Sequence, residues 1–282
     1  METSKTQMVP HVERILLATD CSAFSEGAEQ EAIFIGQSCG AALTILHVIE
    51  DNEEFSTIGH ETVKKMEISA RIHLEKIFQM AINENIKTTL VVRRSMSPDL
   101  AIYEEVLKQN IDIVITGRRG RRGIKKLLMG VVTERVAARV PCKTLIVPKD
   151  FVIQGDGVLL ATDGLSCSEK AKDEAINMVA RCDYLKYVCV VSTVDNDAAL
   201  AGATKRVEHI GKSIREKNKK IVIETVAEVA PPCDLIVRKA KEKKVDMIVM
   251  GSNNKNGLQR LIKGSLCADL IAVAPCSVLI TK

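Results

Sequence analysis

The two halves of the chain contain the same segments in the same order, and this duplication constrains the fold more than any other feature. The recurring pairs are RILLATDCSAFSEGA (14–28) with GVLLATDGLSCSEKA (157–171), IDIVITG (111–117) with VDMIVMG (245–251), and PCKTLIV (141–147) with PCSVLIT (275–281). A repeat of this length is a domain and not a solenoid unit. We therefore predict two tandem domains, residues 1–150 and 151–282.

Within each half, short apolar runs alternate with amphipathic stretches. In the first half the runs typical of buried strands are residues 14–20, 42–49, 88–94, 111–117 and 143–148. The stretches with helical spacing and helix-type ends are residues 25–40, 61–85, 97–110 and 130–140. Strict alternation of this kind predicts an α/β fold, with a parallel sheet covered by helices on both faces. The second half repeats the order.

Length and composition narrow the class of protein further. The chain has 282 residues, of which 46% are hydrophobic, so each half can bury its own core. The net charge of +4 is too small to indicate a nucleic-acid-binding protein by itself. Nine cysteines, without C-x-x-C spacing, are expected to be reduced thiols. We find no signal peptide and no run long enough to span a membrane, and therefore expect a soluble, cytoplasmic protein.

The most informative local feature is the glycine-rich basic segment ITGRRGRRG (115–123), at the end of the fourth expected strand. In open α/β sheets, ligands bind beyond the carboxyl ends of the strands, where the strand order reverses. Asp20, after the first strand, would face the same crevice. Glycines allow close approach of the backbone, and a helix that begins at Gly130 offers N–H groups and a positive dipole end to an anion. Together with the loop arginines, this pattern favours a di- or triphosphate over a neutral ligand.

Three motifs resemble those of the universal stress protein family. They are the strand LLATD, the strand ILHVI, and G-x2-G-x9-G before the last helix, and the resemblance covers essentially the whole chain twice. It implies two tandem three-layer α/β/α domains, each with a five-stranded parallel sheet of order 3-2-1-4-5. It also implies an adenine nucleotide (ATP, ADP or AMP) as ligand, with magnesium as an optional companion, although several members of the family bind none. The last strands of family members commonly mediate pairing, so we expect the two domains to form an intrachain pair.

The resemblance and the crevice argument define a candidate set. For nucleotide binding in the first domain it comprises Thr19, Asp20, Val48, Thr116, Gly117, Arg118, Gly120, Gly130, Val131 and Thr133. The candidates for a second site are Asp163, Gly251, Gly264 and Ser265. Both copies depart from the family pattern: Val131 replaces a hydroxyl residue, and Asn254 replaces the second glycine. A missing hydroxyl weakens a phosphate site, whereas a side chain in the loop obstructs it, so we expect the first domain to be the main site.

Simpler interpretations stay open for several residues. The basic loop can be a solvated turn, and Asp20 and Asp163 can merely cap the following helices. Thr133 can be an ordinary helix residue, and His47 is expected to be a packed core or crevice histidine. RNA binding is disfavoured because aromatic residues make up only 3% of the chain and none flanks the loop. The pattern shows no catalytic set and no metal-ligand spacing.

Three functional hypotheses follow from this reading. The first is a stress-response regulatory protein that binds an adenine nucleotide and presents a changed surface to a protein partner. The second is a stress scaffold that binds no nucleotide, and the third is a slow ATPase. The sequence leaves open the identity of the partner and the pairing of two chains into a homodimer.

Overall fold

The structure is a computed structural model that describes residues 8–50, 60–119, 130–252 and 266–282, with the side chains of residues 60–66 left out. The first half contains β1 (Arg14–Ala18), α1 (Glu26–Cys39), β2 (Ala42–Glu50), α3 (His60–Asn83), β3 (Thr88–Ser95), α4 (Pro98–Gln109), β4 (Ile113–Gly117), α5 (Val131–Arg139) and β5 (Lys143–Val147). The second half contains β6 (Gly157–Ala161), α6 (Ser166–Arg181), β7 (Tyr187–Val194), α7 (Asp197–Lys217), β8 (Val222–Val229), α8 (Pro232–Lys243), β9 (Met247–Gly251), α9 (Leu266–Val273) and β10 (Ser277–Thr281).

Each half forms the predicted parallel sheet, and this part of the fold prediction is confirmed. The complete strand order is β3-β2-β1-β4-β5-β10-β9-β6-β7-β8, so each half has the order 3-2-1-4-5. The central strands are almost completely buried because helices cover both of their faces, as their unbroken apolar runs predict. The edge strand β3 alternates more exposed and less exposed residues instead.

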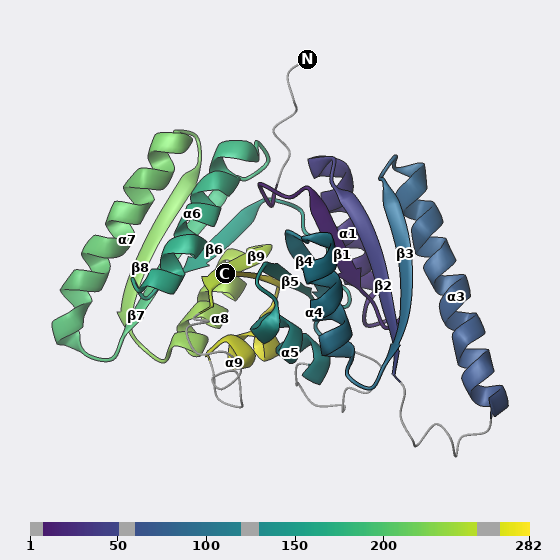
Figure 1. The fold of residues 1–282 in the computed structure, drawn as a ribbon. Helices are drawn as coiled ribbons and strands as arrows, with labels where there is room; N and C mark the ends of the chain where they lie inside the picture. Colours follow the sequence, from purple (N-terminus) through teal and green to yellow (C-terminus); the bar gives the residue numbers. More distant parts are fainter. Residues whose placement is uncertain (1–7, 51–59, 120–129, 253–265) are drawn as a thin grey trace.

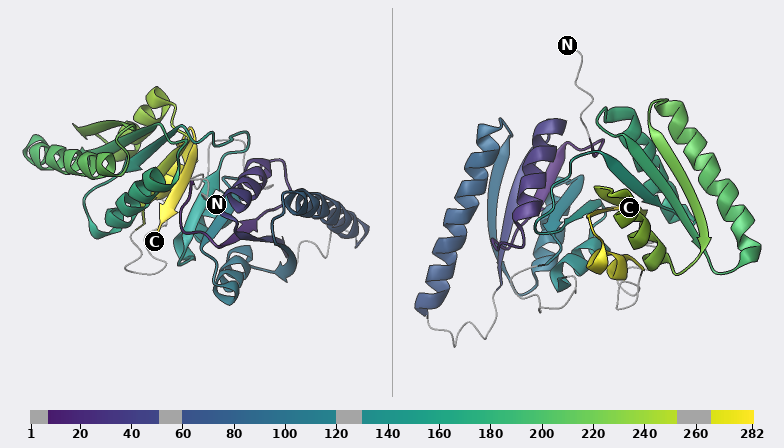
Figure 2. Two further views of the ribbon diagram at one scale, coloured as in Figure 1. Left: turned by 90° about the horizontal axis from the view of Figure 1, so that it is seen from above. Right: turned by 180° about the vertical axis from the view of Figure 1, so that it is seen from behind.

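Helices cover the sheet in two layers (Figures 1 and 2). One layer, with α1, α3, α6 and α7, packs on a single hydrophobic cluster that runs through both halves. On the opposite face, the second half packs α8 and α9 on one cluster, and the first half packs α4 and α5 on another. Continuity of the first cluster means that the two domains share part of one core.

The two sheets join through β5 and β10, which pair in antiparallel orientation and make one ten-stranded sheet. Leu145 lies opposite Leu279, and both are completely buried. The sequence predicted that the domains pair within the chain, and this junction is how they meet. The antiparallel direction follows from a local two-fold relation between the copies, because equivalent strands meet at the junction.

Segments outside the two sheets also connect the halves. The Met8 sulfur lies 3.9 Å from the Cys182 sulfur, and Lys143 donates to the carbonyl of Pro10 at 2.7 Å. Residues 8–12 therefore contact both halves, and the proposed division at residues 150 and 151 stays a prediction. Among the described helices, none combines the length and the apolar character that crossing a bilayer requires.

Candidate functional site

The candidate crevice lies where the order of the first sheet reverses, at the carboxyl ends of β1 and β4. These strands are neighbours, and Ala18 pairs with Thr116. Thr19 and Asp20 therefore follow β1 beside Gly117 at the end of β4, as expected for convergent strand ends. Val48 lies two residues before the end of the neighbouring strand β2 and is half-buried.

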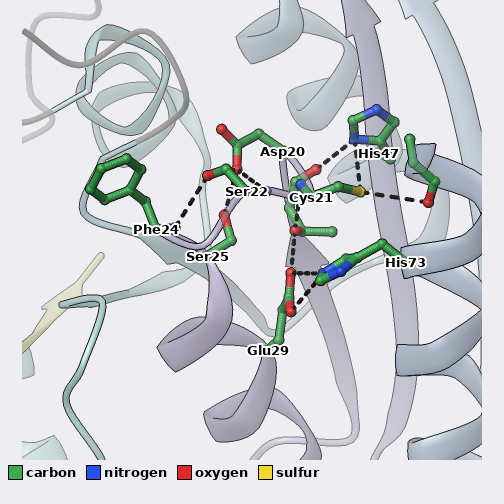
Figure 3. A network of polar contacts seen from close by, with 10 residues as sticks. Asp20, Cys21, Ser22, Phe24, Ser25, Glu29, His47 and His73 are labelled. Carbon is green, nitrogen blue, oxygen red and sulfur yellow. Dashed lines mark hydrogen bonds and ion pairs between the residues drawn. The ribbon is translucent and has the colours of Figure 1, made fainter. Parts of the chain in front are cut away.

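The Asp20 carboxylate organises the turn that leads into α1 (Figure 3). Its Oδ1 accepts hydrogen bonds from the backbone N–H and the hydroxyl of Ser22, at 3.0 and 2.7 Å, and from the hydroxyl of Ser25 at 2.8 Å. Cys21 has a left-handed backbone with φ of 57°, which lets the chain turn sharply here. These three bonds go to Ser22 and Ser25, which precede the first residue of α1, so they stabilise the turn and not the N–H groups of the helix.

A buried network of hydrogen bonds holds the residues at the start of this turn. The Thr19 hydroxyl donates to the Glu29 carboxylate at 2.6 Å, and His73 Nε2 lies 3.0 Å from both oxygens of the same carboxylate. His47 Nδ1–H donates to the carbonyl of Thr19 at 2.9 Å, and the Cys21 sulfur lies 3.6 Å from the same nitrogen. Thr19 is 5% exposed, so its hydroxyl serves the network and does not face the crevice.

His47 was expected to be a packed core or crevice histidine, and the structure buries it with its Nδ1 on the Thr19 carbonyl, whereas the roles of Glu29 and His73 were missed. A buried glutamate on α1 that meets a histidine on α3 leaves no local signal, because the two residues are far apart in the chain. Glu29 and His73 also line part of a cavity between these two helices.

The glycine at the end of β4 is required by packing. A Cβ on Gly117 would lie 2.7 Å from the carbonyl oxygen of Phe24, at the start of α1, which is closer than real Cβ atoms come to other atoms. Its own carbonyl accepts a hydrogen bond from the buried Thr133 hydroxyl at 2.9 Å. Thr133 therefore ties α5 to β4, and Thr116 is buried within β4.

The N-terminus of α5 opens toward this end of β4. Gly130 donates its N–H to the carbonyl of Arg118 at 2.9 Å, and as the N-cap residue it has no side chain to cap the helix. Val131, in the first turn, is 60% exposed. Gly120, the second glycine of the motif, lies outside the described residues, as do Arg121 and Arg122.

The Arg118 side chain extends to the second half of the chain, whereas the sequence led us to expect it at the nucleotide. Its Nη2 donates to the carbonyls of Ala274, at 2.6 Å, and Cys276, at 3.4 Å, both in the second half of the chain. Burial lowers the pKa of this guanidinium, and the neighbouring charge of Arg119 lowers it further. The Arg118 side chain therefore extends from the start of the loop toward the other domain.

The corresponding crevice of the second half is different. Asp163 is exposed, and its Oδ1 accepts the N–H of Leu165 at 2.8 Å. The guanidinium of Arg206 packs so closely over Gly164 that a Cβ there would clash with it, and it donates to the Ser192 hydroxyl at 3.4 Å. An arginine of α7 thus packs over the turn that corresponds to the Cys21 turn of the first half.

The second half retains the close contact at the glycine that ends the strand before the loop, Gly251 at the end of β9. A Cβ on Gly251 would clash with the carbonyl oxygen of Cys167, just as a Cβ on Gly117 would clash with that of Phe24. Asn254, Gly264 and Ser265 lie outside the described residues. Within the described part of the chain, no group of three or more histidine, cysteine or acidic side chains is arranged to hold a metal ion. None of the nine cysteines, all of which lie in the described residues, forms a disulfide within the chain.

Fold and crevices define a tandem, doubly wound α/β protein whose halves are copies of one domain. The sequence profile of the Universal stress protein family matches residues 11–148 and 156–282. The chain belongs to this family and carries its domain twice, which confirms the resemblance found in the sequence.

Relatives of one and of two domains are similar to this chain. A universal stress protein of Methanocaldococcus jannaschii is 31% identical over 137 residues, which is 44% of this chain and 81% of that protein. One from Synechocystis is 22% identical over 287 residues, which is 92% of this chain and 96% of that protein. The crystal structure of a universal stress protein from Archaeoglobus fulgidus has a TM-score of 0.75 at 21% identity and covers 96% of this chain and 99% of its own. At that identity the likeness shows the fold alone.

Proposed function

We propose that the first domain binds an adenine nucleotide (ATP, ADP or AMP) and that binding regulates a cytoplasmic stress response through a protein partner. One observation supports this most: Asp20 follows β1 and the N-terminus of α5 adjoins the end of β4, so both lie at the point where the strand order of the sheet reverses. A carboxylate accepts hydrogen bonds from ribose hydroxyls or an adenine amino group. The helix end provides N–H donors and a positive dipole end for phosphates.

The structure also suggests how strong such a site is. Val131 has no hydroxyl to donate, and the Thr133 hydroxyl is already bonded to Gly117. One missing hydrogen bond to a charged phosphate costs about 1.5–3 kcal/mol, or roughly ten- to a hundredfold in affinity. We therefore expect weaker binding than at a site with a hydroxyl residue at this position. The backbone N–H of Val131 is unaffected by this substitution.

The second domain should bind the nucleotide poorly or not at all. The Arg206 side chain packs on Gly164 in the turn after β6. In the first domain the equivalent turn has Cys21 in place of Gly164, and the Cys21 sulfur contacts His47 instead of an arginine. A nucleotide in the second crevice would have to displace a guanidinium that already packs and donates there.

A matched pair of variants tests the assignment. Asp20→Asn keeps the size of the side chain and removes its charge, and Asp163→Asn makes the same change in the second copy. Isothermal titration with ATP and magnesium should give one site per chain, lost in Asp20→Asn and kept in Asp163→Asn. Equal affinity for wild type and Asp20→Asn would show that the site is assigned wrongly.

A scaffold that binds no nucleotide is the second candidate. The observation in its favour is that Asp20 Oδ1 accepts three local hydrogen bonds and the Thr133 hydroxyl is bonded to Gly117, so both residues have structural roles without a ligand. It predicts that neither ATP nor AMP moves the melting temperature of the protein. A clear shift that disappears in Asp20→Asn would exclude it. Steady release of phosphate from ATP, abolished by substitution of Gly120, would instead support the slow ATPase.

A further inference from the structure

The junction between the domains connects the glycine loop of each domain to the last helix of the other. Arg118, the first residue after β4, donates through Nη2 to the carbonyl that follows α9 (Ala274) and to Cys276 just before β10. These carbonyls lie at the negative end of the α9 dipole, where a cation is favourable. The partners of the Arg118 guanidinium thus lie in the short segment between α9, the helix after the other domain's glycine loop, and β10.

The equivalent position in the second domain makes the reciprocal connection. Ser252 follows β9 as Arg118 follows β4, and its N–H donates to the carbonyl of Thr281 as that of Arg118 donates to Val147. The Ser252 hydroxyl lies 3.3 Å from the Lys282 ammonium, which also donates to the carbonyls of Ala137 and Ala138 at the end of α5. The C-terminal end of α9 is therefore bound by Arg118, which begins the glycine loop of the first domain. The C-terminal end of α5 is bound by Lys282, which lies beside Ser252 at the start of the glycine loop of the second domain.

Arg118 adjoins both the proposed phosphate site, through its backbone, and the junction between the domains, through its side chain. Its own carbonyl accepts the N–H of Gly130, the residue that opens α5. Its backbone is therefore adjacent to the helix end that would receive phosphates, while its side chain extends to α9. Phosphate oxygens bind a guanidinium in a bidentate, charge-assisted way, which is stronger than hydrogen bonds to neutral carbonyls.

We propose that nucleotide phosphates in the first domain compete with the carbonyls of Ala274 and Cys276, directly after α9, for Arg118, so that binding in the first domain loosens the C-terminal end of α9 in the second. This inference rests on the proposed nucleotide site and adds its regulation. By linkage, any partner that holds α9 in its present place weakens phosphate binding by the same factor. Adenosine, which has no phosphate, leaves the Arg118 contact intact.

Hydrogen exchange of the full chain, followed by mass spectrometry of peptides covering residues 266–276, tests this competition. In the wild type, saturating ATP should speed exchange at the end of α9 by about tenfold, the effect expected for losing a hydrogen bond to a charged group. Adenosine at saturation should leave exchange unchanged. Arg118→Gln should exchange fast without ligand and show no further change with ATP.

Two further variants serve as controls. Arg119→Gln removes the same charge one residue further along, and its ligand-free α9 exchange should equal that of the wild type. Arg118→Lys keeps a cation that can reach one carbonyl and should restore much of the protection. The comparison of ATP with adenosine in the wild type needs no variant and holds even if Arg118→Gln folds poorly.

The outcomes separate the two proposals. Calorimetric binding of ATP with unchanged or slower α9 exchange would overturn the competition and leave the nucleotide site standing. Ligand-free Arg118→Gln with wild-type α9 exchange would also overturn it. No binding of ATP or adenosine to the wild type would overturn the nucleotide site, and the competition with it.

Discussion

Glu31 is a buried carboxyl group at the junction between the domains, and replacing it should change how stability depends on pH. It lies on α1 and is 1% exposed. Its Oε1 accepts the backbone N–H of Ile153, between β5 and β6, at 2.6 Å, and its Oε2 has no hydrogen-bond partner among the described residues. Burial raises its pKa from 4.5 to about 7, against the lowering effect of the Ile153 hydrogen bond, and the negative charge of Asp246 adds to the rise.

The direction of the pH effect follows from whether the folded and the unfolded chain hold the Glu31 proton at a given pH. Below pH 4.5 the folded and unfolded chains both hold the Glu31 proton. As the pH rises toward 7, the unfolded chain loses this proton and the folded protein keeps it, so the free energy of unfolding falls. At higher pH the carboxylate is ionised while buried. The difference between 4.5 and about 7 corresponds to about 3 kcal/mol of lost stability.

The variant Glu31→Gln should remove this loss. Glutamine keeps an oxygen for the Ile153 N–H and is neutral at every pH. Measured by urea unfolding, its stability relative to the wild type should improve by about 2–3 kcal/mol between about pH 5 and pH 8.5. Parallel pH curves for the two proteins would refute the reasoning.

Glu174 provides the matched control, because it occupies the equivalent position on α6 but forms an ion pair with Lys143 at 2.7 Å. Burial raises its pKa as well, although Lys143 opposes the shift. Glu174→Gln leaves the Lys143 ammonium without its carboxylate and should cost roughly 2 kcal/mol at neutral pH. A gain in stability from Glu174→Gln would contradict this account of the two buried acids.

Two further predictions concern packing and thiol reactivity. Gly117→Ala should cost about 2 kcal/mol, because its Cβ would meet the Phe24 carbonyl at 2.7 Å. Gly202→Ala, within α7 where a Cβ meets nothing within 4 Å, should gain about 0.5–1 kcal/mol. Thermal unfolding that shifts the same way in both variants would contradict the packing argument. Burial raises the pKa of Cys189 to about 11 and of Cys276 to about 12, so neither should react with N-ethylmaleimide in the native protein at neutral pH. Rapid labelling of either thiol, located by mass spectrometry, would show that it is accessible.

Much of the fold could be predicted because the repeat and the strand–helix alternation are local patterns. Each central strand is a short apolar run because both of its faces are covered, and this can be read without knowing its neighbours. The strand order came from the family resemblance and was confirmed. The resemblance also led us to expect that the domains pair through their last strands, but the register and direction of that pairing could not be predicted, because the apolar runs of β5 and β10 do not show which residues lie opposite one another.

The candidate site was predictable in part. Asp20 and Gly117 follow strands whose ends meet, so their proximity could be inferred from topology. The direction of the Arg118 side chain could not, because it depends on carbonyls more than 150 residues away in the chain. For the same reason the Glu29–His73 contact was missed.

The sequence by itself determined that this protein consists of two α/β domains of the universal stress protein family, because repeats, periodicity and turn residues act over short distances. Only the tertiary structure decided which residues contact one another between the two halves. It placed the Arg118 guanidinium on the carbonyl that follows α9 and the Lys282 ammonium on the last turn of α5, and it buried Glu31 at the junction. These features depend on which surfaces meet when two folded domains share a core, and no local pattern encodes that choice.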